Sequence, residues 1–274
     1  MTVGTALAQG TRLLEDGGIA AARLTAEILL GYAMRVERVY LFAHPERDLS
    51  EIEWLHYGRY LHERLRGKPT QYITRRQEFY GREFRVTPDV LIPRPETEHV
   101  VEVALEAAKG ARRVLDIGAG SGALAVTLQL ETGAEVWATD VSAAAALVAA
   151  ENAGRLGARV QFVVCDLMGA IAGASMDAIV SNPPYVPLTQ RESLQREVRD
   201  FEPGVALFAG ETGFELYDRI TADAPRVLRA GGWLVMELGF GSLAHVEGLL
   251  ADWREVRVVP DLAGIPRVIA ARRG

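Results

Sequence analysis

The chain has 274 residues, a formal net charge of −6 and 49% hydrophobic residues, which is typical of one large folded domain or of one domain with a small partner. Its single cysteine excludes an internal disulfide, and no run of about 18 apolar residues is present to span a membrane. The lack of a signal-peptide profile in residues 1–10 makes a cytoplasmic protein with no membrane partner the default expectation. The acidic charge argues against a protein that holds nucleic acid mainly by neutralising phosphates, so no direct nucleic-acid partner is expected, although a local basic patch is not excluded.

Residues 1–70 predict a small helical domain. Apolar residues recur there at helical spacing, for example from residue 24 to residue 30. Ser50, followed three residues later by Glu53, is a capping box, a pattern with which helices begin. We expect that helix to end before Pro69, because proline cannot continue a helix.

Residues 71–92 predict a β-hairpin linker. Their apolar side chains come in short β-prone pairs, and Gly81 between two of these pairs is a turn signal. The pairs are Tyr72 with Ile73, Phe79 with Tyr80, and Phe84 with Val86.

Residues 93–274 predict a third part of α/β class. Pro95 suits the first position of a helix that runs to about Lys109, and strands then alternate with helices. This alternation indicates a mostly parallel sheet with helices on both faces. The predicted strands are 113–117, 135–139, 160–164, 178–181, 233–237, 255–259 and 267–271, and the predicted helices are 123–130, 143–156, 216–228 and 243–250.

A glycine-rich turn follows the first of these strands and leads into a helix. Glycines let the backbone turn sharply and approach a ligand closely, and the helix N-terminus offers free N–H groups. Asp140, at the end of the next strand, is placed to accept hydrogen bonds from both hydroxyls of a ribose. The pattern favours a nucleoside cofactor over a purely structural turn. The spacing alone does not exclude a dinucleotide cofactor, because alanine, here Ala123, is tolerated at the position of the last glycine in the dinucleotide-binding motif. The residues of the turn are Gly118, Ala119, Gly120, Ser121 and Gly122.

A second motif, Asn182-Pro183-Pro184-Tyr185, follows the fourth strand at the carboxyl end of the sheet. The two prolines stiffen the chain and lack N–H donors. The side-chain oxygen of Asn182 and a nearby carbonyl, such as that of Pro183, can accept both hydrogens of a planar –NH₂ group, and Tyr185 can stack on that group. The alternative is an Asn-Pro turn that only ends a strand.

Residues 114–122 resemble the first motif of class I S-adenosylmethionine-dependent methyltransferases. The resemblance implies a Rossmann-like domain in which the glycine turn holds the methionine portion of S-adenosyl-L-methionine and Asp140 holds its ribose. It also implies that Asp166 contacts the adenine amine, the alternative being a helix cap. Leu167 would pack on the adenine, and Asn182 would border the cofactor as well as the substrate.

Nearly the whole chain resembles the peptide chain release factor glutamine N5-methyltransferase family. The resemblance rests on residues 67–73, 79–81, 92–98 and 201–203 together with the two motifs above. It implies a seven-stranded methyltransferase domain, a helical domain that helps to recognise the substrate, and methylation of the glutamine in the Gly-Gly-Gln motif of class I release factors. In relatives an aromatic residue of the linker walls the glutamine pocket. Phe79 or Tyr80 is the candidate here, with a core position as the alternative.

Three other functions remain open at this stage. A glutamine methyltransferase acting on a ribosomal protein shares both motifs, and a DNA adenine N6-methyltransferase shares the Asn-Pro-Pro-Tyr pattern. A non-catalytic binding module that kept the cofactor fold is the third. The histidines and Cys165 show no metal-ligand spacing, so no metal is expected. The long connection over residues 186–210 suggests a flap over the substrate.

Overall fold

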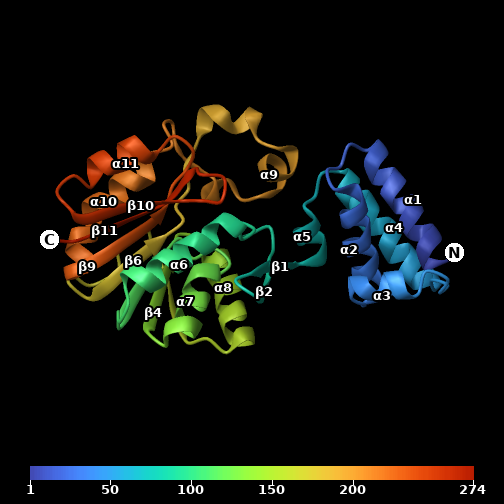
Figure 1. The fold of residues 1–274 in the computed structure, drawn as a ribbon, viewed down its shortest axis with the longest axis horizontal. Coiled ribbons are helices and arrows are strands. Elements are labelled where there is room, and N and C mark those ends of the chain that lie inside the picture. Colours follow the sequence, from blue (N-terminus) through green and yellow to red (C-terminus); the bar gives the residue numbers. More distant parts are fainter. The chain divides into compact units, whose positions relative to one another are not determined.

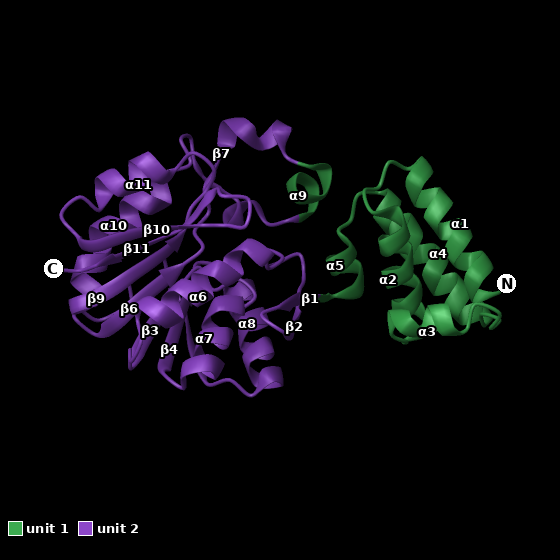
Figure 2. Cartoon of the chain, in the orientation of Figure 1, with its two compact units in different colours: residues 1–76, 195–201 green, residues 77–194, 202–274 purple.

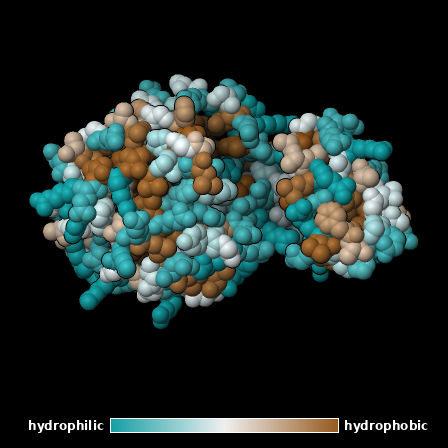
Figure 3. Space-filling model, viewed as in Figure 1, coloured by the Kyte–Doolittle hydropathy of each residue, from teal (hydrophilic) through white to brown (hydrophobic).

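A computed structural model describes all residues of the chain, 1–274, and divides them into two compact units. Unit 1 comprises residues 1–76 and 195–201, and unit 2 comprises residues 77–194 and 202–274 (Figure 2). No helix of the structure has the length and apolar character that crossing a membrane requires. Hydrophilic residues cover most of the visible face, and hydrophobic patches are interspersed among them (Figure 3).

Unit 1 is a helical bundle, as the sequence predicts. Its core is formed by apolar side chains from its longer helices, including Leu14, Leu30 and Tyr57. The predicted capping box is confirmed, because the Ser50 side chain accepts a hydrogen bond from the backbone of Glu53 while the Glu53 carboxylate accepts one from the backbone of Ser50. The helices are α1 (Val3–Asp16), α2 (Ala22–Met34), α3 (Arg38–Ala43), α4 (Glu51–Leu65), α5 (Thr70–Thr74) and α9 (Arg196–Phe201).

The linker hairpin is shorter than the sequence suggests. Strands β1 (Arg76–Phe79) and β2 (Arg82–Arg85) are joined by Tyr80 and Gly81, both with positive φ, as a tight two-residue turn requires. The prediction that Tyr72 and Ile73 belong to the hairpin is wrong, since both lie in α5. Their side chains are buried there, so burial rather than β-propensity decides their conformation.

The core of unit 2 is a seven-stranded sheet of order β10-β11-β9-β6-β3-β4-β5. The pairs of β3 with β4, β3 with β6, β4 with β5 and β6 with β9 are parallel, and β11 runs antiparallel to both β9 and β10. The mostly parallel α/β fold is thereby confirmed. The strands are β3 (Arg113–Ile117), β4 (Glu135–Asp140), β5 (Val160–Val164), β6 (Met176–Ser181), β9 (Leu228–Glu237), β10 (Arg254–Pro260) and β11 (Pro266–Arg272).

Helices cover both faces of this sheet (Figure 1). Because successive strand residues point to opposite faces, Val114 packs in one hydrophobic cluster and its neighbour Leu115 in the other. The first cluster contains apolar residues of α6 (Glu98–Ala107), α7 (Ala123–Thr132) and α8 (Ala143–Leu156), and the second contains those of α10 (Glu215–Val227) and α11 (Leu243–Leu249). A 3-10 turn, η1 (Pro95–Thr97), precedes α6 and has Pro95 at its start.

The connection between β6 and α10 is built of short ordered elements. These are β7 (Val186–Pro187), η2 (Leu188–Ser193), α9, η3 (Gly204–Ala206) and β8 (Phe208–Gly210). Strands β7 and β8 pair in parallel, so the two ends of this segment lie together. The segment thus leaves unit 2, contributes α9 to unit 1 and returns to unit 2.

Candidate functional site

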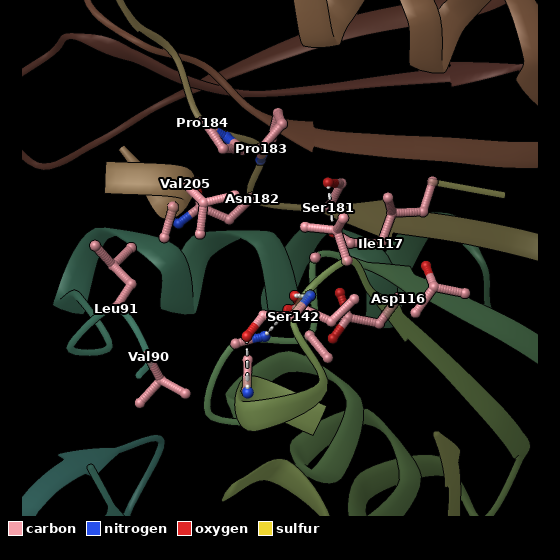
Figure 4. Close-up of a pocket in the computed structure, with 18 of the residues that line it drawn as sticks. Val90, Leu91, Asp116, Ile117, Ser142, Ser181, Asn182, Pro183, Pro184 and Val205 are labelled. Atoms are coloured by element: carbon pink, nitrogen blue, oxygen red, sulfur yellow. Dashed lines mark hydrogen bonds between the residues drawn. The ribbon is translucent and has the colours of Figure 1, made fainter. Parts of the chain in front are cut away.

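A cavity of about 410 Å³ opens in unit 2 at the carboxyl ends of β3, β4, β5 and β6. Open parallel sheets bind their ligands at this edge, because the loops that follow the strands converge there. Figure 4 shows Asn182, Pro183 and Pro184 in sequence after Ser181, across the cavity from Ser142. The cavity therefore lies between the two motifs that the sequence singles out.

The glycine turn is held by β4, its neighbour in the sheet. The backbone N–H groups of Gly118 and Ala119 both donate to the carbonyl of Thr139 at 2.9 Å. Gly118 and Gly120 have φ values of +80° and +53°, a conformation that glycine adopts without strain. A Cβ atom built on Gly118 would meet no protein atom within 4 Å, so the turn faces open space that a ligand can occupy.

Asp140 anchors this turn from the end of β4. One carboxylate oxygen accepts from the backbone N–H of Gly120 at 2.9 Å, and the other accepts from that of Ser142 at 2.8 Å. Each oxygen has a second lone pair for a ligand hydroxyl. Asp140 is thus part of the loop architecture, and its contact with a ribose stays a prediction.

Asp116 lies beneath the glycine turn and is 1% exposed. One of its oxygens accepts from the backbone N–H of Ala125 at 3.1 Å, and the other has no hydrogen-bond partner. Burial, with a smaller effect from the nearby Asp140, raises the pKa of Asp116 to about 8. An orphaned buried carboxyl group on the wall of the cavity fits a cationic ligand group, and S-adenosyl-L-methionine carries both an ammonium and a sulfonium.

Asn182 is the first residue after β6 and is connected to two other buried polar side chains. Its Nδ2 donates to Thr97 Oγ1 at 2.9 Å, and Thr97 Oγ1 donates to Glu237 Oε2 at 2.6 Å. Glu237 ends β9 and is 1% exposed, and its burial raises its pKa to about 7. Asn182 Oδ1 has no hydrogen bond within the protein and is the acceptor that the site offers.

Tyr185 also points to Glu237. Its hydroxyl lies 3.4 Å from Glu237 Oε1, and its ring packs closely on Gly239, where an added Cβ would approach a ring carbon to 2.6 Å. Burial, with Glu237 nearby, raises the pKa of Tyr185. The ring therefore supports the network around Asn182, and its side chain does not line the cavity.

The structure brings most of the predicted site residues together. Three of them lie elsewhere. Gly122 packs against Ala149, Tyr185 lies behind the cavity wall, and Phe79 is a core residue that meets Phe84 edge to face at 6.1 Å. For Phe79 this favours the alternative of a core aromatic. The predicted residues that do line the cavity are Gly118, Ala119, Gly120, Ser121, Asp140, Asp166, Leu167, Asn182, Pro183 and Pro184.

Sequence reasoning missed the remaining walls of the cavity. The segment before η1 contributes Val90 and Leu91, and the connection over residues 186–210 contributes Val205 and Phe208. The sequence predicted that this connection forms a flap, but it did not identify which of its side chains line the cavity.

Two ion pairs involve residues at the cavity. Arg94 is paired with the buried carboxylate of Glu202, which also accepts from the backbone N–H of Ile92. Asp166 is paired with Arg219 of α10 at 2.6 Å. Asp166 thus already has an ionic partner at the place where an adenine contact is expected.

Family models and relatives of known name match along most of the chain. Residues 5–74 match the model of the PrmC N-terminal domain, and residues 97–198 match that of the methyltransferase small domain. The release factor glutamine methyltransferase of Koribacter versatilis is 45% identical over 277 residues, which cover 100% of this chain and 99% of the relative. The protein of the same name from Bacillus subtilis is 41% identical, with 90% of each chain covered.

Solved structures resemble the fold at lower identity. A methyltransferase from Pyrococcus furiosus superposes with a TM-score of 0.55 at 18% identity, over 71% of this chain and 90% of its own. The catalytic domain of hMettl16, solved in complex with an RNA hairpin, gives a TM-score of 0.58 at 20% identity, over 70% and 74% of the two chains. These structures show that unit 2 has the class I methyltransferase fold.

Proposed function

The chain belongs to the release factor glutamine methyltransferase family, and from this premise we propose how its residues transfer a methyl group to a release factor. It is an S-adenosylmethionine-dependent enzyme that methylates the side-chain amide nitrogen of the glutamine in the Gly-Gly-Gln motif of class I release factors. The other glutamine methyltransferase function, the DNA methyltransferase and the non-catalytic module are not favoured by the relatives.

We propose that the glycine turn, Asp116 and Asp140 hold the cofactor. The bound cofactor supplies an electrophilic methyl group on a positively charged sulfur. Asp140 accepts from the ribose hydroxyls, and the orphaned oxygen of Asp116 faces the positive charge of the ligand. Gly118 leaves the space that the methionine portion requires.

We propose that Asn182 and Pro183 hold the glutamine amide. An amide nitrogen is a weak nucleophile because its lone pair is delocalised into the carbonyl group. Asn182 Oδ1 and the Pro183 carbonyl accept its two hydrogens, aim the nitrogen at the methyl group and stabilise the positive charge that develops on it. No strong base is needed before transfer.

The observation that carries this proposal is the orientation of the Asn182 amide. One hydrogen of its nitrogen is bonded to Thr97, which fixes the orientation of the amide, and its oxygen has no partner within the protein and is available at the cavity. An acceptor at this position suits a target that presents hydrogens on nitrogen, and an –NH₂ group is such a target.

We also propose that unit 1 recognises the release factor and that the enzyme acts in the cytoplasm, where translation terminates. The match of residues 5–74 to the family's N-terminal domain supports the first of these roles.

The function is tested by methyl transfer from labelled S-adenosyl-L-methionine to three purified substrates in parallel: a class I release factor, ribosomal proteins and DNA. We expect label in the release factor alone, and none after Gln→Ala substitution in its Gly-Gly-Gln motif. Label that persists after this substitution contradicts the assigned target atom. Label only in ribosomal protein or only in DNA establishes the corresponding alternative.

A further inference from the structure

Glu237 is a buried carboxyl group that neither sequence motif contains. It ends β9, is 1% exposed and does not line the cavity. Thr97 and Tyr185 bind its two oxygens, and Thr97 in turn binds Asn182. A carboxyl group is costly to bury, so its presence one hydroxyl away from Asn182 calls for a role in the site.

The hydrogen of the Thr97 hydroxyl defines that role. Thr97 Oγ1 lies 2.9 Å from Asn182 Nδ2 and 2.6 Å from Glu237 Oε2. An amide nitrogen can only donate, so Thr97 accepts from Asn182 and gives its single hydrogen to Glu237. An ionised carboxylate can only accept, and it therefore enforces this order. As a result, Asn182 keeps its oxygen for the substrate.

A neutral Glu237 permits the reverse order. A protonated carboxyl group can donate to Thr97, and the Thr97 hydrogen is then free to bond Asn182 Oδ1. The Asn182 amide would then present its nitrogen, a donor, to a target nitrogen that also carries hydrogens. That arrangement opposes binding of an –NH₂ group instead of favouring it.

We propose that Glu237 is a positioning residue that, acting through Thr97, keeps the oxygen of Asn182 turned toward the glutamine amide. This inference rests on the proposed function and adds to it the pair Thr97 and Glu237. Tyr185 steadies the second carboxylate oxygen.

Several charged and titratable groups surround Glu237. Burial raises the pKa of Glu237 to about 7 and Glu96 of η1 adds to the rise, while the hydrogen bond from Thr97, the Arg267 guanidinium of β11 and Tyr185 oppose it. Tyr217 of α10 donates to the backbone carbonyl of Glu237 at 2.9 Å. Because the ionised form is the one that orients Asn182, we expect kcat to decrease as the pH falls through about 7.

The test measures kcat for methyl transfer to the release factor from pH 6 to pH 9, with both substrates saturating. In Glu237→Gln, the new amide can donate to Thr97 as well as accept from it. The direction of the hydrogen bonds from Asn182 through Thr97 to residue 237 is then no longer fixed. We expect kcat at pH 8 to fall about 10- to 100-fold and the decrease toward low pH to disappear. Cofactor affinity, measured by calorimetry, stays unchanged, because Glu237 does not line the cavity.

Two substitutions at Thr97 give a second, independent readout. Thr97→Val keeps the shape but removes the hydroxyl, and we expect the same loss of kcat. Thr97→Ser keeps the hydroxyl and restores most of the rate. Thr127→Val is the matched control, since Thr127 is a fully buried threonine whose hydroxyl has no partner, and we expect its kcat and pH profile to match the wild type.

Several results overturn the proposal. These are a Glu237→Gln enzyme with wild-type kcat and pH profile, a Thr97→Ser enzyme as slow as Thr97→Val, or a loss of cofactor affinity as large as the loss of kcat. If Glu237→Gln does not fold, the two Thr97 variants decide. A wild-type enzyme that transfers no label to the release factor contradicts the proposed function instead, so the two failures are distinguishable.

Discussion

Asp140 and Asn182 lie at the ends of different strands and have different partners. Asp140 binds the backbone of Gly120 and Ser142, which belong to the cofactor side of the cavity. Asn182 binds Thr97, and its free oxygen is assigned to the substrate amide. Replacement of each residue should therefore affect a different step of the reaction.

We expect Asn182→Ala to lower kcat by about 100-fold or more while cofactor affinity stays near that of the wild type, because its oxygen acts on the developing charge of the transition state.

Asp140→Ala should mainly weaken cofactor binding. It removes two acceptors of backbone N–H groups as well as the ribose contact, so cofactor affinity falls at least about 10-fold. Calorimetry and saturation kinetics on both variants measure the two effects. Equal losses of cofactor affinity in the two variants would contradict this division.

At the residue scale, local patterns in the sequence were sufficient to locate the glycine turn, Asp140 and Asn182. Each lies next to the end of a strand, and each of these residue types has a known binding role at that place. Thr97 and Glu237 were not predicted, because the two residues are 140 positions apart and meet only in the folded chain. A buried glutamate at the end of an apolar strand was the one available signal.

Helices α7 and α8 approach each other closely at Gly122, the N-cap of α7. Gly122 has a φ of +83°, and a Cβ built there would lie 3.1 Å from Ala149 Cβ and 3.2 Å from Ala149 Cα. The backbone of α8 cannot yield easily, since it packs against β4 and β5. Gly122 is thus required for helix packing beside the cofactor turn, although it does not line the cavity.

We expect Gly122→Ala to lower the free energy of unfolding by about 2 kcal/mol, from backbone strain together with crowding. Gly133→Ala is the matched control. Gly133 caps the other end of α7 with a φ of +68°, and a Cβ there would meet no atom within 4 Å, so only the strain of about 1 kcal/mol applies. Urea unfolding of both variants measures the difference. Equal losses of unfolding free energy in the two variants would mean that crowding against Ala149 does not destabilise the protein.

At the element scale, the sequence predicted best where strands and helices alternate. Helix α8 and strands β3 and β5 have the predicted bounds, because their apolar periodicity is strong and their ends carry turn or capping residues. Residues 71–74 were misplaced since a pair of β-prone side chains is too short to distinguish a strand from a buried helical turn. The path of residues 186–210 depends on packing that no local pattern encodes.

For the molecule as a whole, titration of its carboxyl groups sets the pH range of greatest stability. The backbone N–H of Thr212 is the main cause that lowers the pKa of Glu215 to about 2, so its contribution is present above pH 4 and is lost as the pH falls toward 2. Burial raises the pKa of Asp116 to about 8 and that of Glu237 to about 7, which has the opposite effect. The unfolded chain loses both protons near pH 4, while the folded chain keeps that of Glu237 up to about pH 7 and that of Asp116 up to about pH 8. The folded state without cofactor therefore loses stability as the pH rises over this range.

Asp116→Asn tests this expectation, since asparagine can still accept from the backbone N–H of Ala125 but does not titrate. One pKa unit corresponds to about 1.4 kcal/mol. We expect the stability of the variant relative to the wild type to increase by at least about 1 kcal/mol between pH 5 and pH 8. Urea unfolding in the absence of cofactor, followed by tryptophan fluorescence, measures this difference. The same variant should bind the cofactor more weakly, because a bound cation favours the ionised form of Asp116 and asparagine cannot ionise. A difference in stability that does not change with pH would show that Asp116 is already ionised in the folded protein at pH 5.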